Sequence, residues 1–149
     1  MPDMRIAFAG SGNIATHLAI AFKRAGFEIN CIYSRNKVHA VKLASKVKCA
    51  YTTTPADLKA DLIVIAVNDD AINLVSDQIV SGKSIVVHTS GSVGLDVLST
   101  HKNRGVFYPL QTFSPGRRVD FNSIPLCIEA SSTPVKGKLF SVEIGRAHV

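Results

Sequence analysis

The stretch that decides the fold is Arg5 to Ala15, which reads RIAFAGSGNIA. An apolar run leads directly into the pattern G-x-G-x-x-A, formed by Gly10, Gly12 and Ala15, and apolar residues at helical spacing follow. Strand, glycine turn and helix in this order are typical of dinucleotide-binding proteins. The first glycine allows a tight turn, the second lets a pyrophosphate approach the backbone, and the small third residue lets helix and strand pack closely. Free N–H groups at the helix start can hold the phosphates.

This segment has two other interpretations. A signal peptide is suggested by the apolar N-terminus and by the A-x-A motif at residues 19–21, but Asp3 offsets Arg5, and Asn13 and His17 interrupt the apolar region. A helix–strand unit without a ligand is the second alternative, because a fold does not oblige a function.

Composition narrows the class of protein. The 149 residues suit one domain, of which 46% are hydrophobic and 19% charged, as in ordinary globular proteins. The net charge is +6, but the basic residues form no long run, so we expect no nucleic-acid or membrane partner and favour an anionic small-molecule ligand. Cys31, Cys49 and Cys127 form no C-x-x-C motif, which predicts buried free thiols in a reducing, cytoplasmic protein.

The C-terminus carries an unusual hexapeptide. Residues 144–149 read IGRAHV, which one reading frame of a widely used DNA-sequencing adapter encodes, so we expect this tail to be an artefact. Ser132, Thr133 and Pro134 have the pattern of a helix cap followed by an early proline. The expected organisation is a Rossmann domain over 1–132, the start of a truncated C-terminal helical domain over 133–143, and the artefact over 144–149.

Strand and helix patterns alternate along the chain. This alternation predicts an α/β fold, a doubly wound parallel sheet with helices on both faces and strand order 3-2-1-4-5-6. The expected strands cover residues 4–9, 27–33, 48–51, 62–67, 84–88, 105–108 and 126–129. The expected helices cover residues 13–25, 37–47 and 54–57, with a further helix capped by Asn68 or Asp69.

The end of the second strand discriminates between dinucleotides. An NAD or FAD site places an acid there for the ribose hydroxyls, but residues 33–37 read YSRNK. Arg35 can bind a 2′-phosphate with two charge-assisted hydrogen bonds, and Ser34 and Asn36 can donate to the same oxygens. We therefore predict NADP, with a solvated helix start at Arg35 and Lys37 as the alternative. The missing acid also argues against FAD and S-adenosylmethionine.

Three later strands end in polar segments that should line the crevice of the sheet. Ala66, Val67 and Asn68 are expected to border the cofactor, whereas Asp69 and Asp70 fit a helix cap and a first-turn acid. No metal-ligand cluster occurs in the sequence, and no lysine or carboxylate pair stands out as a general base.

The candidate catalytic residues are His88, Ser90 and Tyr108. His88 is either a general acid or a satisfied core histidine, and Ser90 either contacts phosphate, nicotinamide or substrate or caps a turn together with Ser92. The phenol of Tyr108 is placed to donate a proton to a carbonyl or imine, unless it is only a half-buried aromatic. Residues 111 and 112, a glutamine and a threonine, are suited to orienting a substrate.

Several segments in order resemble one family, above all AGSGNIATHLAIAF at 9–22, HTSGS at 88–92 and YPLQTFS at 108–114. The chain is similar, over residues 4–143, to Rossmann-like NADP oxidoreductases of the deazaflavin-dependent type, which carry a C-terminal helical domain of unknown function. It is more distantly similar to pyrroline-carboxylate reductases, prephenate dehydrogenases and hydroxyacid dehydrogenases of the 6-phosphogluconate type.

The resemblance implies roles for residues but no substrate, because the family has no assigned reaction. It implies that residues 34–36 meet the 2′-phosphate, that Tyr108 and Pro109 lie beside the nicotinamide, and that a following helical domain closes the substrate pocket and forms a homodimer. By the same resemblance the pyrophosphate is met by Gly10, Ser11, Gly12, Asn13 and Ile14.

Three functions remain open from the sequence. The first is hydride transfer between NADP and a small carbonyl or imine compound. The second is a non-catalytic NADP-binding sensor or scaffold, which the lack of an evident general base favours. The third is a crevice that binds another nucleotide, such as a free deazaflavin.

Overall fold

The computed structural model describes residues 4–110 and 126–142 as a seven-stranded sheet with helices. The strands are β1 Arg5–Ala9, β2 Glu28–Tyr33, β3 Ala50–Thr52, β4 Leu62–Ile65, β5 Ile85–His88, β6 Asn103–Pro109 and β7 Leu126–Ala130. The helices are α1 Asn13–Arg24, α2 Lys37–Val47, α3 Asp69–Gln78 and α4 Thr133–Ser141, with 3₁₀ turns η1 Pro55–Asp57 and η2 Leu95–Leu98.

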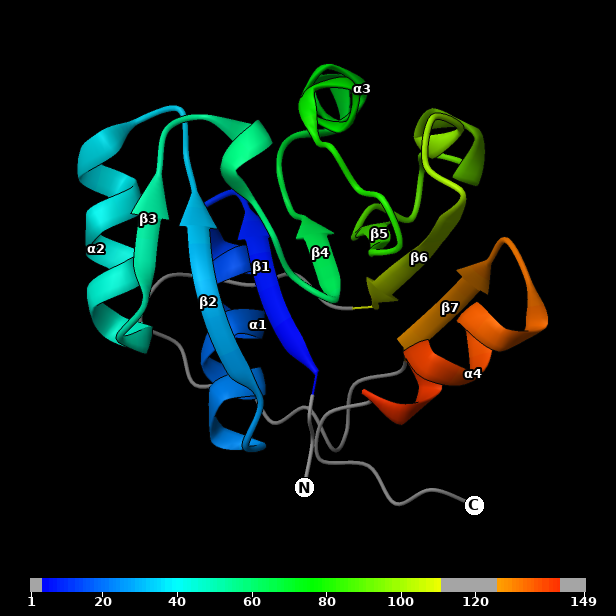
Figure 1. Cartoon of the computed structure of the whole chain (residues 1–149), viewed down its shortest axis with the longest axis horizontal. Coiled ribbons are helices and arrows are strands. Elements are labelled where there is room, and N and C mark those ends of the chain that lie inside the picture. The colour runs from blue at the N-terminus through cyan, green and yellow to red at the C-terminus, as the bar shows by residue number, and fades with distance from the viewer. Residues whose placement is uncertain (1–3, 111–125, 143–149) are drawn as a thin grey trace.

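The strand order is β3-β2-β1-β4-β5-β6-β7, so the predicted order 3-2-1-4-5-6 is confirmed and β7 extends it (Figure 1). The first six strands pair in parallel, as expected. The last strand departs from the prediction of a parallel sheet, because β7 pairs antiparallel to β6, with Gly105 opposite Ala130 and Pro109 opposite Leu126. An antiparallel edge strand is a common addition to a parallel sheet.

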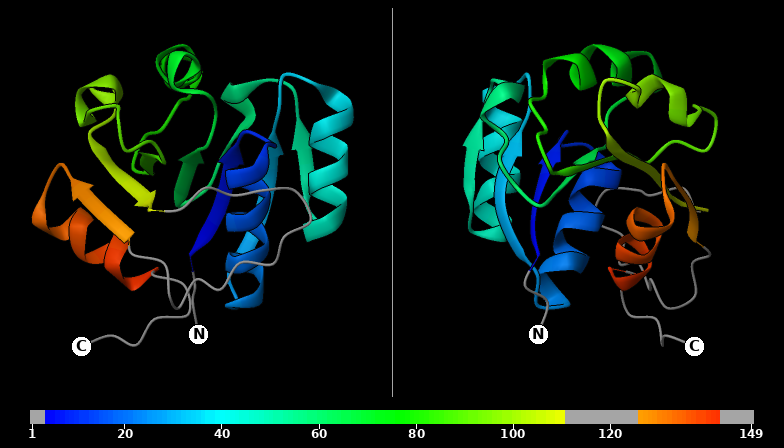
Figure 2. Two further views of the ribbon diagram at one scale, coloured as in Figure 1. Left: turned by 180° about the vertical axis from the view of Figure 1, so that it is seen from behind. Right: turned by 45° about the vertical axis from the view of Figure 1, so that its right-hand side comes forward.

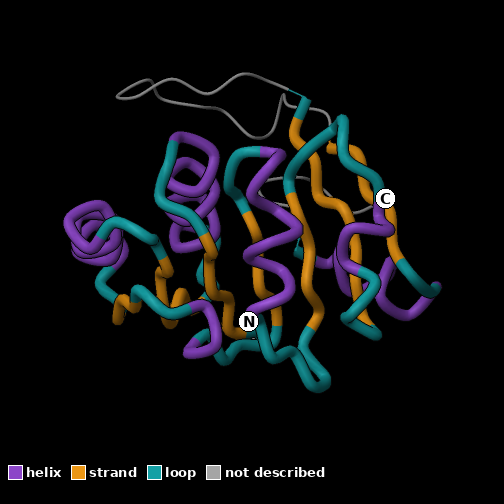
Figure 3. Tube along the Cα trace, turned by 90° about the horizontal axis from the view of Figure 1, so that it is seen from above, coloured by secondary structure: helices purple, strands orange, loops and turns teal. Residues whose placement is uncertain are grey.

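Helices cover both faces of the sheet, as the doubly wound prediction requires (Figure 2). On one face Ile6 and Phe8 of β1 pack with residues of α1, α2 and α4, including Leu18, Leu43 and Leu139. On the other face Ala7 and Ala9 of β1 pack with residues of α3 and η2, including Ile72, Val75 and Leu98. The alternation of strand and helix that produces these two layers can be followed along the tube in Figure 3.

Some element boundaries differ from the sequence-based expectation. The third strand begins at Ala50 rather than Lys48, because Lys48 adopts a left-handed conformation, with φ of 55°, that ends α2. The fourth strand ends at Ile65, since the chain then turns toward α3. The sixth strand is longer than predicted and begins at Asn103.

The prediction of three buried thiols is wrong for Cys127, which is exposed on β7. This strand lies at the edge of the sheet, and its alternate residues face outward. Cys31 and Cys49 are half-buried, and burial raises the pKa of Cys49 to about 11, so its thiol stays protonated at neutral pH. Over residues 4–110 and 126–142, no helix is long and apolar enough to cross a membrane.

The turn between β1 and α1 requires glycine at its first position. Gly10 has φ of +129°, a conformation that side chains rarely adopt. A Cβ atom added there would lie 2.2 Å from the carbonyl oxygen of Ala66, which belongs to rigid backbone after β4. Gly10 therefore lets the end of β1 approach the end of β4.

Gly10→Ala is predicted to destabilise the fold by about 3 kcal/mol, because backbone strain adds to a collision that neither strand can relieve. A loss of this size lowers Tm by about 10 °C in a domain of this length, which differential scanning calorimetry measures. The matched control is Gly12→Ala, since a Cβ at Gly12 meets no atom within 4 Å. Equal Tm values for the two variants would contradict this account.

Candidate cofactor-binding site

The first turn of α1 has the features of an anion site. Gly12 is the N-cap residue of α1 and, as a glycine, has no side chain that could cap the helix. The first turn of α1 holds no acidic residue. A Cβ at Gly12 would point into open space rather than into protein. Unsatisfied N–H groups at a helix start attract phosphate, and the missing side chain leaves room for it. The turn thus fits the pyrophosphate of a dinucleotide.

The other residues predicted for the pyrophosphate lie in the same turn. Ser11 and Asn13 flank Gly12 at the surface, and Ile14 packs partly against the core, so it presents its backbone rather than its side chain. The Gly10 N–H donates to the carbonyl of Tyr33 over 2.8 Å, which fixes the turn against the end of β2.

A hydrogen bond joins the glycine turn to the segment after β2. The Ser11 hydroxyl donates to the Ser34 Oγ over 3.0 Å, and the Asn36 N–H donates to the same oxygen over 3.2 Å. Both lone pairs of the Ser34 hydroxyl are then used, so its hydrogen remains for an external acceptor. A buried hydroxyl that presents a hydrogen at this point suits an anionic ligand.

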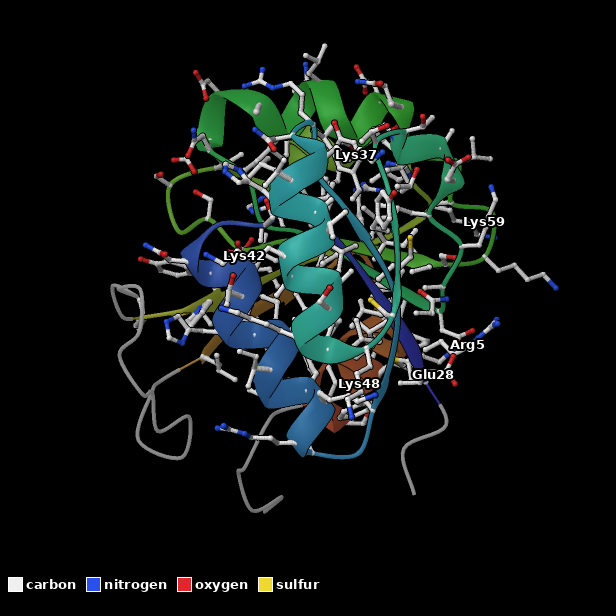
Figure 4. The ribbon with its side chains drawn as sticks, turned by 90° about the vertical axis from the view of Figure 1, so that its left-hand side faces the viewer. Arg5, Glu28, Lys37, Lys42, Lys48 and Lys59 are labelled. Atoms are coloured by element: carbon white, nitrogen blue, oxygen red, sulfur yellow. The ribbon has the colours of Figure 1, made fainter. Side chains whose placement is uncertain are left out.

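The cations predicted for the 2′-phosphate lie at the start of α2, on the same edge. Arg35 and Lys37 are exposed, and Figure 4 shows Lys37 at the opposite end of α2 from Lys48. Among the described residues the single ion pair joins Arg5 to Asp61, so no described carboxylate neutralises Arg35. The Asn36 Oδ1 accepts from the His39 N–H over 3.1 Å and caps the helix, which leaves Nδ2 as the donor that can reach a ligand.

The residues predicted to border the cofactor adjoin the glycine turn. The Ala66 N–H donates to Ala9 over 2.8 Å, and the Val67 side chain lies 3.3 Å from a Cβ built at Gly10. Asn68 is the exposed N-cap residue of α3, but its side chain makes no cap bond. The structure thus brings Ala66 and Val67 beside Gly10, and Asn68 follows them without capping the helix through its side chain.

His88 ends β5 and is fully buried. Its Nδ1 accepts the Ser90 N–H over 3.1 Å, so the ring hydrogen must lie on Nε2, which donates to the carbonyl of Gly94 over 3.1 Å. Both ring nitrogens are therefore used to hold the loop between β5 and η2. This arrangement agrees with the second alternative from the sequence, a core histidine whose two ring nitrogens are both hydrogen-bonded.

Ser90 and Ser92 lie in the same loop, between β5 and η2. The Ser92 hydroxyl donates to the Asp69 carboxylate over 2.7 Å, and the two serine oxygens are 3.3 Å apart. Hydrogen bonds from Ser92 and Ser90 hold the pKa of Asp69 below its ordinary value. Asp69 is the first residue of α3 and binds the serine turn instead of capping its helix, which sequence reasoning missed.

Tyr108 lies near the end of β6 and is partly exposed. Its ring packs so closely on Gly91 that a Cβ there would lie 2.2 Å from Cε2. His88, Ser90 and Tyr108 are thus brought together at the ends of β5 and β6, through the turn around Gly91. The predicted substrate-orienting residues 111 and 112 lie outside the described residues.

No group of three or more His, Cys, Asp or Glu side chains in the described ranges is arranged to hold a metal ion. The glycine turn and the segment after β2 present backbone N–H groups, hydroxyls, the Asn36 amide and the Arg35 guanidinium. These groups suit phosphate, ribose and amide partners rather than a metal.

The solved structures similar to this chain include a protein of Bacteroides fragilis called a "putative NADP oxidoreductase". It is 41% identical, with a TM-score of 0.88 over 98% of this chain and 60% of its own. A pyrroline-5-carboxylate reductase of Coxiella burnetii is 18% identical, with a TM-score of 0.76 over 99% of this chain and 60% of its own.

A prephenate dehydrogenase of A. aeolicus, solved with hydroxyphenyl propionate and NAD+, is 13% identical, with a TM-score of 0.80 over 99% of this chain and 59% of its own. At such low identity the last two structures show a shared fold alone. The chain thus spans about 60% of the length of the first of these structures.

No curated protein matches the sequence. A sequence model of the Rossmann-like domain matches residues 1–113, which hold the glycine turn, the Ser34–Asn36 segment and the His88–Ser92 turn. The sheet order and the glycine turn agree with this match. The chain therefore belongs to the Rossmann-like domain family.

Proposed function

We propose that this chain binds NADP and is part of an oxidoreductase that transfers a hydride to or from a small carbonyl or imine compound. The observation that carries the proposal is the bond between Ser11 and Ser34, which joins the pyrophosphate turn to a cationic segment without an acid. The similarity to the Bacteroides fragilis protein supports the same cofactor class.

The proposed contacts follow from the groups that each residue presents. The N–H groups at residues 11–14 hold the pyrophosphate, and Ser34, Arg35 and Asn36 hold the 2′-phosphate through a hydroxyl hydrogen, a guanidinium and an amide. Ala66, Val67 and Asn68 border the cofactor where it passes β4. An NAD ribose would find no carboxylate in the segment after β2, which favours NADP.

Tyr108 is the proposed proton donor of the reaction. When bound, NADPH supplies a hydride to the carbon of a carbonyl or imine. The Tyr108 O–H then gives its proton to the oxygen or nitrogen of that group, and the phenolate regains a proton from water. Gly91 fixes the ring of Tyr108 through direct contact, and His88 holds the turn that carries Gly91, so His88 acts through that turn.

The remaining expectations concern the whole protein. A C-terminal helical domain that closes the substrate pocket, a homodimer formed through it, and a cytoplasmic location stay predictions. Within the described residues, α4 begins at Thr133 as expected, with the Ser132 Oγ accepting the Val135 N–H over 3.3 Å, and it packs against β6 and β7.

Arg35→Ala is predicted to weaken NADPH binding by about tenfold to a hundredfold, because a 2′-phosphate loses its charge-assisted hydrogen bonds. NADH has no 2′-phosphate, so its affinity should not change. Isothermal titration of both cofactors measures the difference. Lys42→Ala is the matched control, since Lys42 is an exposed cation farther along α2, and it should change neither affinity (Figure 4). An Arg35→Ala variant with unchanged NADPH affinity contradicts the NADP assignment.

Tyr108→Phe is predicted to lower kcat by about a hundredfold or more, the usual contribution of a positioned proton donor, without weakening NADPH binding. The phenyl ring still packs on Gly91, so the fold is kept. The measurement is NADPH oxidation with a panel of small carbonyl and imine compounds, and Tyr51→Phe on β3 is the control. Tight NADPH binding by the whole protein, including the predicted helical domain, without turnover of any compound would contradict the enzyme and favour the sensor.

A further inference from the structure

The two hydroxyls of the turn after β5 have fixed hydrogen directions. The Ser92 Oγ lies 2.7 Å from the Asp69 Oδ2, and because a carboxylate only accepts, Ser92 donates its hydrogen to Asp69. The backbone N–H of Ser92 donates to the Ser90 Oγ over 3.2 Å. One lone pair of the Ser90 hydroxyl is therefore already used.

The hydrogen of the Ser90 hydroxyl also has a fixed direction, toward Ser92. The two serine oxygens lie 3.3 Å apart, and the hydrogen of Ser92 is committed to Asp69, so Ser90 is the donor of that contact. The hydroxyl hydrogens thus form a chain in which Ser90 donates to Ser92 and Ser92 donates to Asp69. The Ser90 Oγ keeps one lone pair, which can accept a hydrogen bond from a ligand.

The turn that carries Ser90 is fixed on its other sides as well. Its backbone is bound to His88, and its glycine lies against the ring of Tyr108. Asp69 comes from a different connection, the start of α3 after β4, so it ties the segments that follow β4 and β5 together. Ser90 therefore lies between the segment proposed to border the cofactor and the proposed proton donor.

We propose that Asp69 is a positioning residue that makes the Ser90 hydroxyl a hydrogen-bond acceptor for the carboxamide N–H₂ group of nicotinamide. This inference rests on the proposed function, because it assigns a contact of the same cofactor. The complementary group is an N–H donor next to the reacting ring, and the carboxamide is the N–H donor that the nicotinamide half carries.

The carboxylate of Asp69 fixes the direction of this chain, because both of its oxygens can only accept, whereas an amide presents one acceptor and one donor. Asn at position 69 offers an N–H₂ group that can donate to Ser92, so the direction of the chain could reverse. The Ser90 hydroxyl would then be free to turn its hydrogen outward, toward the carboxamide hydrogens. The lowered pKa of Asp69 agrees with this role, since it keeps the group ionised at neutral pH.

The test compares NADPH with 2′-phospho-ADP-ribose, which keeps the adenosine, phosphates and second ribose but lacks nicotinamide. Asp69→Asn should weaken NADPH binding by about fivefold, the effect of one lost hydrogen bond, and leave 2′-phospho-ADP-ribose unchanged. Ser92→Ala should show the same selective loss, whereas Ser92→Thr keeps the hydroxyl and should bind like the unaltered chain. Asp70→Asn removes the adjacent first-turn carboxylate of α3 and should change neither affinity.

The outcomes separate this inference from the proposed function. If the unaltered chain binds both ligands but Asp69→Asn and Ser92→Ala leave NADPH affinity unchanged, or weaken both ligands equally, the positioning role is overturned and NADP binding stands. If the unaltered chain binds neither ligand, the proposed function fails and this inference fails with it. If Asp69→Asn lowers Tm, Ser92→Ala and its threonine counterpart decide the question, because Ser92 lies outside any helix.

Discussion

The backbone of Gly10 lies where three parallel strands end, and the site depends on this close approach. Its N–H donates to Tyr33 at the end of β2, and on its other side the carbonyl of Ala66 occupies the space a side chain would need. Because no side chain separates these strand ends, the turn of β1 comes next to both the Ser34–Asn36 segment and the Ala66–Asn68 segment. The start of α1 thereby follows directly after the point where these segments meet.

Two serines that follow β2 and β5 present opposite hydrogen-bonding groups. The Ser34 hydroxyl accepts from Ser11 and Asn36 and keeps its hydrogen, which suits a phosphate oxygen. The Ser90 hydroxyl gives its hydrogen to Ser92, which donates to Asp69, and it keeps a lone pair, which suits an amide N–H₂. A ligand with phosphate at one end and a carboxamide at the other matches this order, and NADP is such a ligand.

Local sequence patterns were enough to predict the fold and the segments that adjoin the glycine turn. The glycine pattern at Gly10 and Gly12 and the alternation of apolar runs give the strand order, since both depend on neighbouring residues. The antiparallel pairing of β7 and the exposure of Cys127 depend on the far edge of the sheet, where short strand patterns carry no direction. The bond between Asp69 and Ser92 joins residues 23 positions apart in two loops, and no local pattern marks such a contact.

The central claim is that the open space at Gly12 holds the pyrophosphate of NADP. Isothermal titration of NADPH into the unaltered chain and into Gly12→Ala tests it most directly, because the added methyl group meets no protein atom within 4 Å. The account predicts binding by the unaltered chain, an affinity about tenfold or more lower in Gly12→Ala from steric overlap with the ligand, and equal Tm values without ligand. Equal NADPH affinities for the two chains would contradict it.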